Sequence, residues 1–231
     1  AIFLDGANVQ GRHTGLCVIE NCSVMAFSDL TKSFSMGIHI NELHEVSIIN
    51  SQFFMDFGDS VLVDSINTGV FIDASSSSLP GHYYVSNCTF LYGNAGIQIQ
   101  EYVEGLYVHS CSFVAGDNGI ICDSDGAGGN EPGLQVTNCH FNQGTQQMGH
   151  GIRGEGMVDV LIDNNLFYVH PPGGQPIGER GCIYLEKSET YCINNNTFKR
   201  IGPTLIANQF TYAITIKVPN TSYEIGSIQS N

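Results

Sequence analysis

A short pattern occurs seven times along this chain. In each copy an apolar alternation runs into Asn, often followed by Cys, and ends on an apolar residue that is usually Phe. The copies end at Val24, Phe53, Phe90, Phe113, Phe141, Phe167 and Phe198. Three residues before each end, one column contains Asn21, Asn50, Asn87, Ser110, Asn138, Asn164 and Asn195. A spacing kept over most of the chain indicates one structural unit that is repeated and stacked.

A second element lies between these copies and usually consists of Gly followed by an alternating apolar pair. Its copies begin at Gly37, Ser60, Gly96, Gly119, Gly151, Cys182 and Ala213. Each repeat therefore contains three short strands, and no segment has a convincing helical period. Strands this short gain backbone partners when each pairs with its copy one turn later. The pattern predicts an all-β, right-handed parallel β-helix, a solenoid of about eight coils.

The repeat continues without a linker, so residues 1–231 are expected to form one β-helix domain. Both ends look like strands, and raw strand edges would be exposed there. We therefore expect a fragment of a longer chain that lacks its caps. Asn at the corner column suits a left-handed backbone conformation, so that column is expected to be structural.

Charge and cysteine placement limit the possible partners. The net charge is −14 with only 8 Lys plus Arg, which argues against nucleic acid and against a polyanionic substrate. No run of 18 apolar residues occurs, so membrane insertion is not expected. Cys22, Cys88, Cys111 and Cys139 share one repeat column, which favours free buried thiols over disulfides. No zinc motif is present, and we expect neither metal nor cofactor.

Alternation along the Gly-led strands separates inward from outward side chains. One outward column contains Asn41, Asp64, Gln100, Asp123, Glu155, Glu186 and Lys217. Its three consecutive acids would lie about 5 Å apart from coil to coil and about 10 Å apart across two coils. The shorter spacing suits a retaining glycosidase and the longer an inverting one. Asp123, Glu155 and Glu186 are therefore the catalytic candidates, and a merely solvated acidic face is the alternative.

The other outward column contains His39, Leu62, Gln98, Ile121, Arg153, Tyr184 and Thr215. Arg153 and Tyr184 could hold sugar hydroxyl groups, and Gln98 and Gln100 are further substrate-binding candidates. Insertions at 123–133 and 168–181 flank the same coils, and a third spans 73–81. Insertions at coil corners can form the walls of a groove on a solenoid face.

The chain also resembles the pectin-lyase-like superfamily of β-helical, polysaccharide-active proteins, which includes polygalacturonases, pectate lyases and phage tailspikes. Gly149-His150-Gly151 matches the Gly-His-Gly of polygalacturonases. Asp117-Asn118 stands where those enzymes have Asp-Asp, and Gly93-Asn94-Ala95 stands where they have Asn-Thr-Asp. Tyr184-Leu185-Glu186 replaces their Arg-Ile-Lys. Asp117 and His150 survive from that set and are substrate-binding candidates.

The line of acids is most similar to bacteriophage tailspikes, in which carboxylates on the outer helix face cleave bacterial surface glycans. That resemblance implies an endo-glycoside hydrolase of a bacterial polysaccharide, a capsule or an O-antigen. It also implies a homotrimer located in the virion tail. A secreted polysaccharide lyase or epimerase remains an alternative, as does a non-catalytic adhesive or structural β-helix.

Overall fold

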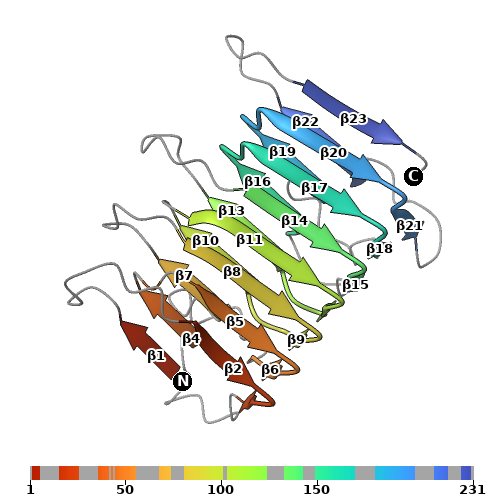
Figure 1. The fold of residues 1–231 in the computed structure, drawn as a ribbon. Helices are drawn as coiled ribbons and strands as arrows, with labels where there is room; N and C mark the ends of the chain where they lie inside the picture. The colour runs from red at the N-terminus through yellow and green to blue at the C-terminus, as the bar shows by residue number, and fades with distance from the viewer. Residues whose placement is uncertain are drawn as a thin grey trace.

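Successive strands of the computed structural model wind around one axis, and each lies on its copy from the previous turn (Figure 1). The structure describes residues 2–5, 16–25, 36–41, 43, 45–55, 68–73, 81–100, 103–123, 133–142, 149–169, 180–200, 211–217 and 225–229. The predicted insertions lie almost wholly outside these residues, at 74–80, 124–132 and 170–179. Within the described ranges, no helix is long and apolar enough to cross a membrane.

Three parallel sheets form the faces of the coil. Sheet A contains β1 (Ile2–Asp5), β4 (Met36–Asn41), β7 (Thr68–Asp73), β10 (Ala95–Gln100), β13 (Asn118–Asp123), β16 (His150–Glu155), β19 (Arg180–Glu186) and β22 (Thr211–Lys217). Each strand pairs only with the copies one turn before and after it. Along this sheet the colour in Figure 1 runs from red to blue, so order in the sequence is order along the axis.

Sheets B and C complete each turn. Sheet B contains β2 (Cys17–Glu20), β5 (Val46–Ile49), β8 (Gly81–Ser86), β11 (Val103–His109), β14 (Gly133–Thr137), β17 (Asp159–Asp163), β20 (Thr190–Asn194) and β23 (Ile225–Gln229). Sheet C contains β3 (Ser23–Met25), β6 (Gln52–Phe54), β9 (Thr89–Leu91), β12 (Ser112–Val114), β15 (His140–Asn142), β18 (Leu166–Val169) and β21 (Thr197–Arg200). With sheets of 8, 8 and 7 strands, the predicted parallel β-helix of about eight coils is confirmed.

The asparagine column turns the corner between sheets B and C. All seven of its residues have a left-handed backbone, with φ between 52 and 57°, including Ser110 at 53°. Asn tolerates this conformation better than most residues, because its short polar side chain can bond locally. The backbone N–H of each corner residue also donates to a backbone carbonyl of the next coil, as that of Asn87 does to His109 at 3.1 Å. The predicted structural role of this column is confirmed.

The bore of the coil is filled by stacked side chains. Phe53, Phe90, Phe113, Phe141, Phe167 and Phe198 form a continuous ladder with ring centroids 4.7 to 5.2 Å apart. All eight cysteines are free thiols, as predicted, and five of them are buried. In the shared column, Cys88, Cys111 and Cys139 each donate to the carbonyl two residues earlier, at 3.2 to 3.4 Å.

The second copy of the Gly-led strand, which the sequence pattern predicted to begin at Ser60, lies outside the described residues. Sheet A instead uses β7, which pairs Phe71 with both His39 and Gln98, and Asp73 with both Asn41 and Gln100. Phe71 and Asp73 therefore occupy the outward columns at this coil, and Leu62 and Asp64 lie outside the described residues. Gly69 explains the choice, because a Cβ there would come within 2.8 Å of the Phe90 ring. A glycine at this point lets β7 pass the phenylalanine ladder without displacing a ring.

Candidate functional site

The three predicted acids lie in one line on the outer face of sheet A. Gln100 pairs with Asp123, Asp123 with Glu155, Glu155 with Glu186, and Glu186 with Lys217. Successive strands of a sheet are about 4.8 Å apart, so neighbouring acids share one short stretch of surface. Towards the N-terminus, the same outward column continues from Gln100 through Asp73, Asn41 and Asp5.

Asp123 lies at the end of β13 with its side chain 37% exposed. Its Oδ1 is buried and makes no hydrogen bond, although the Nη2 atom of Arg153 lies 3.8 Å away. Burial raises the pKa of Asp123, Arg153 opposes this effect, and the nearby charge of Glu155 adds to it. A carboxyl group whose protonated form is favoured can act as a general acid.

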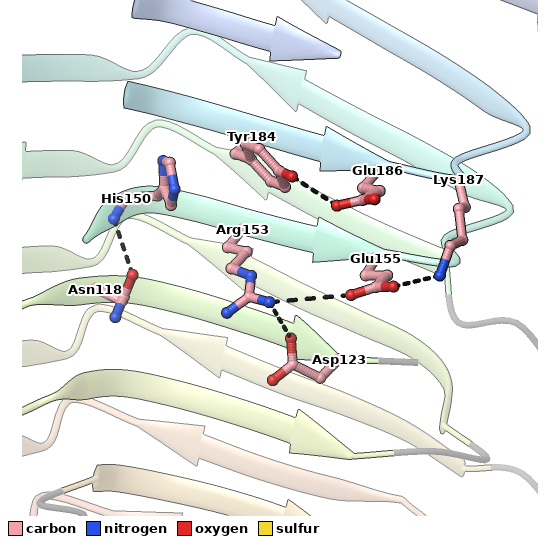
Figure 2. Close-up of polar contacts among 8 residues, drawn as sticks. All are labelled: Asn118, Asp123, His150, Arg153, Glu155, Tyr184, Glu186 and Lys187. Atoms are coloured by element: carbon pink, nitrogen blue, oxygen red, sulfur yellow. Dashed lines mark hydrogen bonds and ion pairs between the residues drawn. The ribbon is translucent and has the colours of Figure 1, made fainter. Parts of the chain in front are cut away.

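Glu155 is the most strongly paired of the three acids. Lys187 donates to its Oε1 at 2.6 Å, and the Nη2 atom of Arg153 lies 3.9 Å from its Oε2. Figure 2 shows the guanidinium between Asp123 and Glu155, with Lys187 reaching Glu155 from the corner. Both Arg153 distances exceed hydrogen-bonding range, and the side chain is 42% exposed. Its N–H groups thus remain available to a ligand.

Glu186 is held by a tyrosine rather than by a cation. The hydroxyl of Tyr184 donates to its Oε2 at 2.6 Å (Figure 2). Tyr184 itself is buried, with 7% of its surface exposed. The ring of His150 lies 4.9 Å from the Tyr184 ring, and the Nζ of Lys217 lies 5.0 Å from it. Burial raises the pKa of Tyr184, and the hydrogen bond to Glu186 raises it further. Lys217 partly offsets this increase.

The remaining predicted residues surround this line in different ways. Gln98 pairs with Ile121 and Gln100 with Asp123, which places both glutamines one coil before the acids. The backbone N–H of His150 donates to Oδ1 of Asn118 at 2.8 Å. Asp117 lies in the turn before β13, where its amide donates to the Gly93 carbonyl at 2.9 Å. The structure therefore places Arg153, Tyr184, His150 and the two glutamines on the strands that carry the acids or on the strand before them. Their roles in binding remain predictions.

Lys187 is the main site residue that the sequence pattern did not reveal. It follows Glu186 at a corner, where the alternation of a strand has ended, and its backbone is left-handed with φ of 54°. On the preceding coil the same corner holds Gly156, at φ of 66°. Each donates to the next coil, Gly156 to the carbonyl of Glu186 and Lys187 to that of Lys217. Alternation along a strand predicts which side chains point inward and which point outward, but it does not apply at a corner. It therefore gave no signal that the Lys187 side chain reaches back to Glu155.

Among the described residues, no group of three or more His, Cys, Asp or Glu side chains is arranged to hold a metal ion. Asp123 and Glu155 lie beside the cations Arg153 and Lys187, and Glu186 accepts a hydrogen bond from Tyr184, so the three acids do not converge on one point. The arrangement can donate a proton, accept a proton and bind hydroxyl or anionic groups.

Comparisons with known proteins give one distant likeness. No protein-family model matches the chain, and no curated protein matches it. A family 28 exopolygalacturonase from Yersinia enterocolitica is similar in structure, with a TM-score of 0.42 and 14% sequence identity. The match covers 79% of this chain, which spans 38% of that enzyme. A likeness this distant assigns no activity to the chain.

Proposed function

We propose that the outer face of sheet A binds a polysaccharide and hydrolyses a glycosidic bond. The observation that supports this most directly is the line of carboxylates Asp123, Glu155 and Glu186 on consecutive strands. Burial raises the pKa of Asp123, while the other two acids are held by donors. Glycoside hydrolysis requires one protonated and one ionised carboxyl group on either side of the scissile bond.

Asp123 is the proposed general acid. Its raised pKa keeps the proton on the carboxyl group to higher pH than for an ordinary aspartate. It would pass this proton to the leaving oxygen as the bond between that oxygen and the anomeric carbon breaks. Arg153, 3.8 Å away, would orient the sugar through its free N–H groups.

Glu186 is the proposed general base. It lies two strands from Asp123, which corresponds to about 9.4–9.8 Å along the sheet, near the upper end of the range for inverting enzymes. A water molecule between Glu186 and the sugar would attack the anomeric carbon and give a proton to the carboxylate. Glu155 is less suited to attack, because Lys187 at 2.6 Å and Arg153 at 3.9 Å already engage its two oxygens.

The proposed substrate class is a bacterial surface polysaccharide, either a capsule or an O-antigen. This part, together with a homotrimer and a place in the virion tail, rests on the resemblance of the sequence to tailspikes. Gln98 and Gln100 would bind sugar hydroxyl groups on the coil before the acids. Mass measurement in solution tests the trimer independently of activity.

The test is to incubate the protein with a panel of capsular and O-antigen polysaccharides and to measure new reducing ends. Asp123→Asn and Glu186→Gln are each expected to reduce cleavage at least about 100-fold, the usual contribution of acid–base catalysis. Asp159→Asn, at an exposed position on sheet B, is the matched control and should cleave normally. Cleavage that survives both site variants would refute the assignment of the acids. Unsaturated products would indicate a lyase, and binding without cleavage would indicate an adhesin.

A further inference from the structure

Tyr184 is poorly placed to contact a sugar directly. Only 7% of its surface is exposed, and its ring is packed between groups from the two neighbouring coils. The His150 ring comes from β16 and lies 4.9 Å away, while Lys217 comes from β22 and lies 5.0 Å away. A tyrosine that binds a sugar by stacking must present a ring face to solvent, so this residue needs another explanation.

His150, whose ring lies beside Tyr184, is hydrogen-bonded to the neighbouring strand through its backbone. Its backbone N–H donates to Oδ1 of Asn118 at 2.8 Å (Figure 2). The preceding residue, Gly149, allows this approach, because a Cβ there would lie 2.1 Å from the Asp117 carbonyl and 2.3 Å from Oδ1 of Asn118. Gly149 and the His150 backbone thus hold the His150 ring against one side of the Tyr184 ring.

We infer that Tyr184 is a positioning residue that holds the Glu186 carboxylate in place for proton transfer. Its hydroxyl donates to Oε2 of Glu186 at 2.6 Å, a length typical of a bond to a charged acceptor. Stacking fixes the ring, the hydrogen bond fixes one carboxylate oxygen, and the other oxygen is left to accept a proton. This inference rests on the proposed function, in which Glu186 is the base.

The electrostatic surroundings support a donor role for the hydroxyl. Burial and Glu186 raise the pKa of Tyr184, so the phenol keeps its proton at neutral pH. The charged groups around Glu186 are Glu155 and Lys217 in the neighbouring coils and Lys187 at the next position in the chain. Tyr184 supplies its hydrogen bond to Glu186 from the same strand, two residues earlier.

The test is Tyr184→Phe, which keeps the packed ring and removes only the hydroxyl. The expected result is a fall in kcat of about tenfold, the effect of one hydrogen bond to a charged group, with KM within about twofold of wild type. Adding Tyr184→Phe to Glu186→Gln should cause no further loss, because the positioned carboxylate is already gone. A raised KM with unchanged kcat, or additive losses, would show direct contact with the sugar and overturn the inference.

A second readout does not depend on cleavage. The carboxyl carbon chemical shift of Glu186 can be compared by NMR between wild type and Tyr184→Phe at one fixed pH. Loss of the hydroxyl donor should change that chemical shift. An unchanged chemical shift would overturn the positioning role even in a protein that cleaves. A chemical shift that changes between wild type and variant, while the wild type cleaves no glycan, would refute the proposed function and leave the Tyr184–Glu186 contact intact.

Discussion

At the residue scale, Asp123 has an unsatisfied buried oxygen, which favours a role in function and lowers the stability of the fold. It ends β13 with Oδ1 buried and without a hydrogen bond, and its nearest cation is 3.8 Å away. Burial is the largest influence on its pKa and acts to raise it. A residue selected only for stability would be expected to satisfy that oxygen. Functional sites commonly keep such unsatisfied groups.

The destabilising effect of ionising Asp123 in the folded protein should be visible in the pH dependence of its melting temperature. The folded state binds the Asp123 proton more tightly than the unfolded state, whose pKa is about 3.8. The stabilising effect is therefore fully present below pH 3.8 and is lost as pH rises through that value to the raised folded pKa. Asp123→Asn cannot ionise, so its melting temperature relative to wild type should increase between about pH 3 and pH 7.

Thermal unfolding across that pH range checks this prediction. Asp159→Asn serves as the control for replacing an exposed carboxylate with an amide elsewhere on the coil. A melting-temperature difference for Asp123→Asn that stays constant or falls as pH rises would contradict it.

At the scale of the strand, glycine decides where sheet A passes the phenylalanine ladder. Gly37, Gly69, Gly96, Gly119 and Gly151 occupy equivalent places on successive strands. At Gly119 an added Cβ would lie 2.5 Å from the Gly151 carbonyl and 2.7 Å from the Phe141 ring. Backbone on one side and a stacked ring on the other leave no room for the methyl group.

Gly119→Ala is therefore expected to destabilise the protein by about 1–3 kcal/mol, the usual cost of overpacking a core. The matched control is Gly133→Ala on β14, where the nearest atom to an added Cβ is the Glu104 carbonyl at 3.4 Å. Urea denaturation should show a lower midpoint for the first variant and little change for the second. Equal effects at both positions would contradict the steric account.

The same glycines explain how far the sequence alone could predict the elements. The Asn and Phe columns matched the structure in all seven copies, because a corner that requires φ near 55° and a stacked ring leave strong marks on the sequence. The second Gly-led strand was misplaced, since Ser60-Val61-Leu62-Val63 and Gly69-Val70-Phe71-Ile72 are both plausible apolar strands. Contact between Gly69 and Phe90 distinguishes them, and that contact is tertiary.

The candidate site was predictable to the extent that it follows strand alternation. The line of Asp123, Glu155 and Glu186 and the neighbouring Arg153 follow directly from the column pattern and were predicted correctly as neighbours. Lys187 was missed because it lies at a corner. The burial of Tyr184 was also missed, because it depends on packing against His150 and Lys217 from other coils.

At the scale of the whole molecule, three of the few cations of an acidic chain lie at the proposed site. The chain has only 8 Lys plus Arg and a net charge of −14. Three of these cations, Arg153, Lys187 and Lys217, contact the acids or the tyrosine on the outer face of sheet A. The stacked coils make this possible, because every added turn places new side chains beside the same columns.

The stereochemistry of cleavage is the sharpest test of the roles proposed for Asp123 and Glu186. Proton NMR of the first products, recorded before mutarotation, reports the anomer released from a polysaccharide that the protein cleaves. With Asp123 as acid and Glu186 as base two strands away, the released anomer should be inverted. A retained anomer would instead require attack by the adjacent Glu155 and would contradict the assigned roles of all three carboxylates.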